Sequence, residues 1–153
     1  MRAFVLAIVL ALLVAIYVTP DVGADSEYEA DQRMALVAFA AACKITHYSC
    51  ADLALPEVRR SPYLGRIGNR AVYLLTDVLW LDSELKTSLV PIAIFHEMVH
   101  YLQYNNGMPH ERVTLIRCIS EREAFDATND YFEALGRSSE KISVKKFQDT
   151  YGC

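Results

Sequence analysis

The sequence predicts a helix-dominated α+β domain, in which a small antiparallel sheet precedes two helices that pack against each other. Two short β-prone runs, residues 71–75 and 78–81, are separated by a Thr-Asp pair. A chain of 153 residues, of which 53% are hydrophobic and 22% charged, is large and apolar enough for one folded core. Apolar residues recur at helical spacing in three segments, residues 31–45, 88–105 and 111–135.

Residues 1–24 are typical of a signal peptide. Arg2 supplies a positive charge, residues 3–18 form an apolar run, and Val22-Gly23-Ala24 offers small residues for cleavage after Ala24. An uncleaved membrane anchor is the alternative, because the apolar run is only slightly shorter than a membrane span. Both interpretations place residues 25–153 outside the cytoplasm, periplasmic or secreted, with membrane contact only through the N-terminal segment.

The cysteine content agrees with export to an oxidising compartment. All four cysteines follow the signal segment, and no Cys-x-x-Cys pair suggests a thiolate metal site. Three disulfide pairings are possible, and we favour Cys43 with Cys50 and Cys118 with Cys153. The first pair requires a helix to end between its cysteines, because seven helical residues would separate them by about 10.5 Å.

The first helical segment, residues 31–45, predicts a mostly buried helix with Asp31 as its N-cap. The segment that follows, residues 53–69, contains two prolines and two glycines and therefore predicts irregular structure. Within this segment we expect Arg59 and Arg60 to be solvated charges. The two β-prone runs come next and predict one or two strands.

The second helical segment begins at Ser88, accommodates Pro91 in its first turn and ends before Gly107. It contains His96-Glu97-Met98-Val99-His100. Two imidazoles four residues apart lie on one face of a helix, where both can bind one zinc ion at about 2.0–2.1 Å. Glu97 directly follows the first histidine and can take a proton from a zinc-bound water.

A catalytic zinc site also needs a third protein ligand and an open position for water. The third helical segment contains Ser120-Glu121-Arg122-Glu123-Ala124. A helix here can fold back antiparallel against the motif helix and present a carboxylate. Helical geometry by itself leaves both Glu121 and Glu123 as candidates. The remaining residues, 137–153, predict a surface tail held by a short amphipathic stretch.

With these two elements the chain resembles the gluzincins, zinc metallopeptidases that combine a His-Glu-x-x-His helix with a Glu ligand on a following helix. The resemblance covers residues 71–135 and is closest to the small, single-lobe members. In members with a Glu-x-x-Ala-Asp pattern the leading Glu binds zinc, which implies Glu121 as the ligand here, with Ala124 at the Ala position. Phe125 stands where the family has an Asp that orients a ligand histidine, and Asp126 follows one position later.

The resemblance implies a minimal zincin-like domain over residues 25–153 that hydrolyses peptide bonds. His96, His100 and Glu121 would hold Zn²⁺, and Glu97 would act as the general base and later deliver the proton to the leaving amine. The expected partner is a peptide or protein substrate, for example an envelope component. The candidates for stabilising the oxyanion are His110, Tyr101, Tyr104 and Tyr131.

Two other interpretations stay open at this point. The two histidines can be ordinary core polar residues, with the intervening glutamate on the surface. Alternatively, the chain can be a catalytically inactive, exported zinc-binding or metal-free protein that has a peptidase-like fold and acts as a binding module. Nucleic acid is not an expected partner, because the net charge is −4 and no basic cluster occurs.

Overall fold

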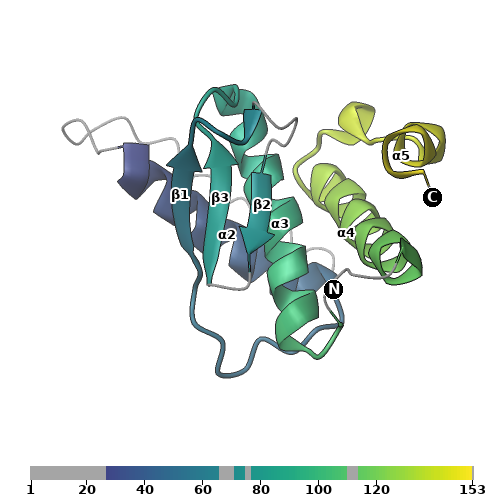
Figure 1. The fold of residues 1–153 in the computed structure, drawn as a ribbon, viewed down its shortest axis with the longest axis horizontal. Coiled ribbons are helices and arrows are strands. Elements are labelled where there is room, and N and C mark those ends of the chain that lie inside the picture. The colour runs from purple at the N-terminus through teal and green to yellow at the C-terminus, as the bar shows by residue number, and fades with distance from the viewer. Residues whose placement is uncertain (1–26, 66–70, 75–76, 110–113, 153) are drawn as a thin grey trace.

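In the computed structural model, helices α2 and α3 lie behind a three-stranded sheet, and α4 and α5 extend the molecule beyond α3 (Figure 1). The structure describes residues 27–65, 71–74, 77–109 and 114–152. The expected signal peptide, residues 1–24, lies outside these ranges. Within them, no helix combines the length and apolar character that a membrane span requires.

The element order confirms a helix-dominated α+β fold. As expected, the motif helix α3 packs against the following helix α4, and it also contacts α2 and the sheet. The elements are α2 (Glu27–Ile45), β1 (Glu57–Ser61), β2 (Ala71–Leu74), β3 (Val78–Asp82), the 3-10 turn η2 (Thr87–Leu89), α3 (Val90–Asn105), α4 (Thr114–Ala134), the 3-10 turn η3 (Ser138–Glu140) and α5 (Val144–Tyr151).

The sheet is mixed rather than wholly antiparallel, with strand order β1-β3-β2. β2 and β3 form the expected antiparallel pair, but β1 lies parallel to β3 in a segment predicted to be irregular. The prediction of irregular structure was wrong there because Pro56 and Pro62 flank the strand and do not interrupt its ladder. Val58 anchors β1 in the core with 1% of its surface exposed. β2 is left as an edge strand beside α3.

The first helix begins one turn earlier than predicted, at Glu27, so Asp31 lies inside α2 and is not its N-cap. Asp31 is 2% exposed and accepts two hydrogen bonds from Arg60 of β1, from Nε at 2.7 Å and from Nη2 at 2.9 Å. Arg60 is therefore not the solvated charge that was expected. The contact joins α2 to β1, and only the tertiary packing of these two elements reveals it.

The other helices agree with the sequence in their main features. α3 has Pro91 in its first turn and is followed by Gly107, whose φ of 88° ends the helix. α4 occupies residues 114–134 of the predicted segment. The expected surface tail contains the short helix α5, which is held by Phe147. This side chain is 3% exposed and its ring centroid lies 4.9 Å from that of Phe125 on α4.

One of the two expected disulfides is present in the described residues. α2 ends at Ile45, and the chain then turns so that the Cα atoms of Cys43 and Cys50 lie 5.9 Å apart in a disulfide. The pairing of Cys43 with Cys50 is confirmed. The second expected pair ends at Cys153, which lies outside the described residues.

The contact between α2 and β1 predicts that two carboxylates that bind Arg60 contribute unequally to the free energy of unfolding. Asp31 is buried, whereas Glu27, whose Oε1 lies 2.9 Å from Nη1 of Arg60, is 70% exposed. Asp31→Asn is expected to lower the free energy of unfolding by about 3 kcal/mol. Glu27→Gln, the matched control, is expected to lower it by less than about 1 kcal/mol. Urea denaturation measures both values, and equal losses would contradict the assigned importance of the buried pair.

Candidate metal centre

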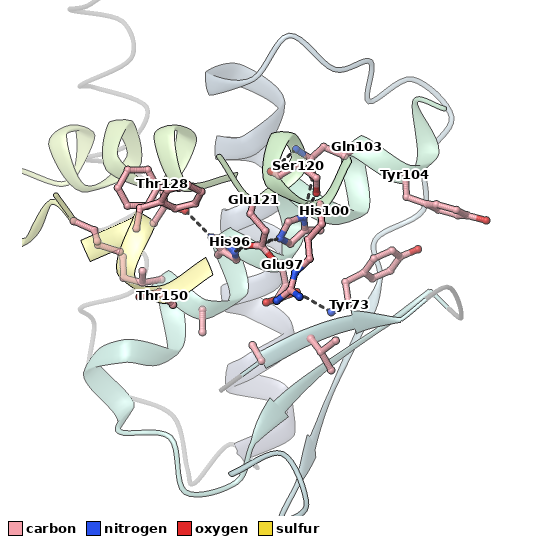
Figure 2. A pocket seen from close by; sticks show the side chains of 18 of the residues that line it. Tyr73, His96, Glu97, His100, Gln103, Tyr104, Ser120, Glu121, Thr128 and Thr150 are labelled. Carbon is pink, nitrogen blue, oxygen red and sulfur yellow. Dashed lines mark hydrogen bonds and ion pairs between the residues drawn. The ribbon is translucent and has the colours of Figure 1, made fainter. Parts of the chain in front are cut away.

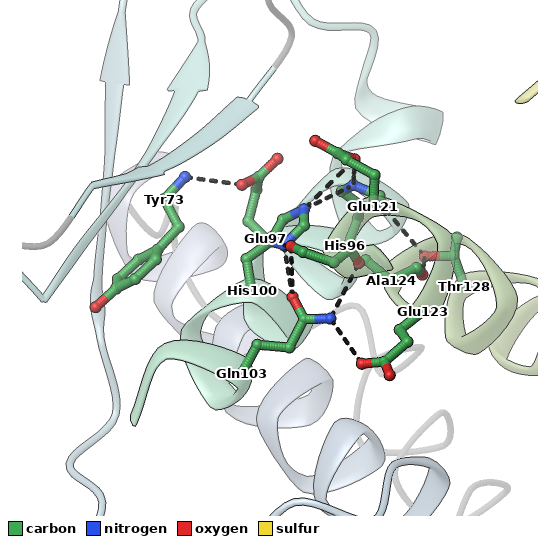
Figure 3. Close-up of polar contacts among 10 residues, drawn as sticks. Tyr73, His96, Glu97, His100, Gln103, Glu121, Glu123, Ala124 and Thr128 are labelled. Atoms are coloured by element: carbon green, nitrogen blue, oxygen red, sulfur yellow. Dashed lines mark hydrogen bonds and ion pairs between the residues drawn. The ribbon is translucent and has the colours of Figure 1, made fainter. Parts of the chain in front are cut away.

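The α3–α4 interface brings three potential metal-ligating atoms together (Figure 3). Nε2 of His96 lies 3.2 Å from Nε2 of His100, and Oε2 of Glu121 lies 3.4 Å and 3.6 Å from these two nitrogens. Ligands bound to one tetrahedral metal at about 2.0–2.1 Å would lie about 3.3 Å from one another. The three residues therefore form a group that could hold a metal ion.

The carboxylate at this site has an unsatisfied oxygen. Oε2 of Glu121 is buried and accepts no hydrogen bond of acceptable geometry from the described residues. A buried carboxylate oxygen without a partner is unfavourable by roughly 1–3 kcal/mol or more. The two imidazoles point their Nε2 atoms at the same position, so a cation bound there would satisfy all three groups. The donor set and its spacing fit a metal ion.

The three groups also control one another's protonation. Burial by itself would lower the pKa of His100, but its contacts with Glu121 and the charge of Glu97 outweigh burial and raise that pKa to about 9. Burial would raise the pKa of the Glu121 carboxyl, but contacts with His100 and His96 hold it well below its usual range. The raised pKa of His100 means that its protonated, cationic form is favoured beside the Glu121 carboxylate. The carboxylate is charged at neutral pH, as a metal ligand must be.

A buried amide fixes the orientation of His100. Nδ1 of His100 lies 2.8 Å from Oε1 of Gln103, which is 1% exposed. Nε2 of Gln103 donates to the Ser120 carbonyl at 3.0 Å and to the Glu123 carboxylate at 3.2 Å. Because both of those partners only accept, the amide oxygen must face the imidazole. His100 therefore donates from Nδ1, which leaves Nε2 as the ring nitrogen that faces the candidate site.

A threonine on α4 fixes the orientation of His96 in the same way. The Thr128 hydroxyl donates its single proton to the Ala124 carbonyl at 2.7 Å. Its oxygen lies 3.3 Å from Nδ1 of His96 and can only accept from it. Both imidazoles are thus held by their outer nitrogens, and both present Nε2 to the same point. Sequence reasoning did not identify Thr128, although it lies two helical turns after Ser120 on the same face of α4.

Glu123, the second candidate ligand, lies away from the three grouped atoms (Figure 3). Its carboxylate accepts a hydrogen bond from the Tyr48 hydroxyl and one from Gln103. Tyr48 lies between the two cysteines of the Cys43–Cys50 disulfide. Burial and the contact with Glu123 raise the pKa of Tyr48 above its usual range. Glu123 therefore supports the amide that orients His100 and does not contact the site directly.

Glu97 lies between the histidine pair and the edge strand of the sheet (Figures 2 and 3). It is 8% exposed, and its Oε2 accepts the backbone N–H of Tyr73 on β2 at 2.7 Å. An edge strand has backbone groups without partners in the sheet, and here one of them binds the glutamate. The carboxylate is thereby held in a fixed position beside the two imidazoles.

These groups open into a cleft of about 900 Å³ (Figure 2). β2 forms one wall, α3 forms the floor, and α4 and α5 form the opposite wall. The charged and titratable residues that line the cleft are His96, Glu97, His100, Glu121, Arg117 and Lys146, together with Tyr73 and Tyr104. The candidate metal site therefore lies on an open cleft and is not enclosed by the protein.

The expected oxyanion-stabilising residues are dispersed. Tyr104 lines the cleft, but its ring points away from the histidine pair (Figure 2). Tyr101 is buried and donates to the Ala54 carbonyl at 2.5 Å, and Tyr131 is buried and stacks on a phenylalanine of α3. His110 lies outside the described residues.

Comparisons with protein-family models, with curated proteins and with solved structures found no match. The class of protein is therefore inferred from the site alone. The chain is a small α+β protein with a candidate metal site, made of two imidazoles and one carboxylate, on the floor of an open cleft.

The hydrogen bond from His96 to Thr128 predicts an effect on metal affinity. Thr128→Val removes the acceptor for Nδ1–H, so we expect the affinity for a divalent transition metal to fall roughly 10- to 100-fold. The matched control is Thr46→Val, because Thr46, directly after the last residue of α2, makes the same type of bond to the carbonyl four residues earlier, at 2.8 Å, and does not line the cleft. Competition against a chromophoric chelator measures both affinities. An unchanged affinity in Thr128→Val would contradict the positioning role of this hydroxyl.

Proposed function

We propose that this chain is a zinc-dependent metallopeptidase that hydrolyses peptide bonds with Glu97 as its general base. The observation that carries the proposal is the triangle of Nε2, Nε2 and Oε2 atoms with edges of 3.2–3.6 Å, on the floor of a cleft. Two imidazoles and one carboxylate with an open fourth position are the donor set of hydrolytic zinc sites. Structural zinc sites are instead closed by four protein ligands.

The same donor set also occurs in non-haem iron sites, and Glu97 is what favours hydrolysis. It is a further carboxylate at the site, anchored beside the imidazoles by β2 and separate from the grouped atoms. Glu97 follows a candidate ligand directly in the chain, as a general base does in zinc peptidases. Imidazole and carboxylate donors of this kind suit Zn²⁺.

Bound Zn²⁺ would lower the pKa of a coordinated water to about 7 and polarise the scissile carbonyl. The chain's own residues would handle the proton. Oε2 of Glu97 is occupied by the Tyr73 N–H, and none of the described residues donates to Oε1. Oε1 would therefore take the proton of the attacking water and pass it to the leaving amine. His96, His100 and Glu121 would bind the ion, oriented by Thr128 and Gln103.

The cleft also suits an extended peptide. β2 pairs with β3 on one side only and lines the cleft, so the backbone groups of its other edge that are not bound to Glu97 could add a substrate strand. Strand addition would place a peptide bond between Glu97 and the opposite wall. The disulfide between Cys43 and Cys50 is compatible with action in the periplasm or outside the cell.

The role of Glu97 predicts that hydrolysis and metal binding can be separated. Glu97→Gln is expected to retain one equivalent of zinc and to lose hydrolysis of a generic peptide mixture by roughly 100-fold or more, because it cannot accept a proton. The exposed Glu84 supplies the matched control, and Glu84→Gln should behave as the wild type. Equal activity at equal zinc content would reject the general-base role. Zinc binding by the wild type without any cleavage would favour the binding module instead.

The positions of Glu121 and Glu123 on α4 predict different effects of their substitution on metal content. Glu121→Gln removes a grouped ligand atom, so the purified protein should lose stoichiometric zinc. Glu123→Gln weakens only the support of Gln103, so we expect zinc to remain with roughly tenfold lower affinity. Elemental analysis and chelator competition measure these changes. Loss of zinc from Glu123→Gln alone would overturn the ligand assignment.

A further inference from the structure

Arg117 is an exposed cation on the wall of the cleft. It lies on α4, four residues before Glu121, and its side chain lines the cleft. Among the arginines of the described ranges, it alone makes no hydrogen bond, ion pair or ring contact. The other arginines in these ranges all have such interactions: Arg33, Arg59, Arg60, Arg122 and Arg137.

Neither a contribution to the folded core nor a role in metal binding explains why an arginine is found at position 117. The Arg117 side chain is exposed, so it contributes little to the core. A positive charge one helical turn from Glu121 repels a bound metal cation, which weakens metal binding slightly. Glu121 does not neutralise Arg117, because the described ion pairs of Glu121 are with His96 and His100. The guanidinium is left available to a molecule in the cleft.

A second cation lies on the same side of the cleft. Lys146 of α5 lines it with an exposed side chain and makes no ion pair within the described residues. α5 is held against α4 by the buried Phe147, so Lys146 is carried by an anchored element. Among the described residues, the carboxylates that line the cleft are Glu97 and Glu121, both of which have partners at the site. With a divalent ion bound, the cleft would be positive although the chain has a net charge of −4.

We propose that the cleft recognises substrates that carry a carboxylate near the scissile bond, with Arg117 as the main specificity-determining residue and Lys146 as a second one. This inference rests on the proposed peptidase function. A guanidinium binds a carboxylate with two parallel hydrogen bonds, which makes arginine well suited to recognise a specific acidic group. The carboxylate can belong to an Asp or Glu side chain or to the C-terminus of the substrate, and the experiment separates these two sources.

Binding is tested first, independently of hydrolysis. The zinc-loaded Glu97→Gln variant is titrated into three dye-labelled hexapeptide pools, and fluorescence anisotropy is measured. One pool contains Glu and has an amidated C-terminus, one contains Gln and has a free C-terminus, and one contains Gln and is amidated. We expect a pool with a carboxylate to bind roughly 10- to 100-fold more tightly than the pool without one. The pool that does so identifies the source of the carboxylate.

The cations are then removed one at a time in the Glu97→Gln background. Arg117→Gln should abolish the preference for the carboxylate, and Lys146→Gln should reduce it. Lys145→Gln is the matched control, because Lys145 is an exposed lysine of the same helix that does not line the cleft. It should leave the preference unchanged. Equal affinity for all three pools, or a preference that survives Arg117→Gln, would overturn the inference.

Hydrolysis of the same unlabelled pools by the wild type separates the two proposals. Cleavage with an Arg117-dependent preference for acidic peptides supports both. Cleavage without that preference overturns the specificity inference and leaves the peptidase intact. Zinc binding with Arg117-dependent capture of acidic peptides, but without cleavage, overturns the peptidase and supports carboxylate recognition. Absence of both cleavage and capture overturns both proposals.

Discussion

The side chains at the centre of this molecule are arranged around a single buried carboxylate oxygen. Within the described part of the chain, Oε2 of Glu121 accepts no hydrogen bond, and it faces two imidazoles across the contact between α3 and α4. An unpaired buried charge is unfavourable, so a proton or a cation at the position between the two helices would stabilise this arrangement. On the α4 side of this contact, the small side chain of Ala124 is fully buried.

Three sets of hydrogen bonds, from α4, from a loop and from the sheet, hold the side chains of this site in place. From α4, Thr128 holds the outer nitrogen of His96. From the loop closed by the Cys43–Cys50 disulfide, Tyr48 reaches His100 through Glu123 and Gln103. From the sheet, the edge strand β2 holds Glu97 by a backbone N–H. Segments far apart in the chain thus converge on one site, and each of them restricts one side chain to one orientation.

The parts of the fold that the sequence predicted well depend on local spacing. The motif helix, the hairpin of β2 and β3, and the end of α2 before Cys50 follow from helical and strand periodicity, turn residues and the reach of a disulfide. Strand β1 was missed because its flanking prolines resemble loop signals. Asp31 was assigned to a helix cap because its partner, Arg60, lies in another element.

By itself the sequence determined that His96 and His100 share one helical face with Glu97 beside them, because the periodicity of a helix is a local property. It could not decide between Glu121 and Glu123, which lie on different sides of α4. Only the packing of α4 against α3 turned Glu121 toward the imidazoles and Glu123 toward Gln103 and Tyr48. The rotation of one helix about its axis relative to another depends on how all of their side chains fit together, so it is a property of the tertiary structure.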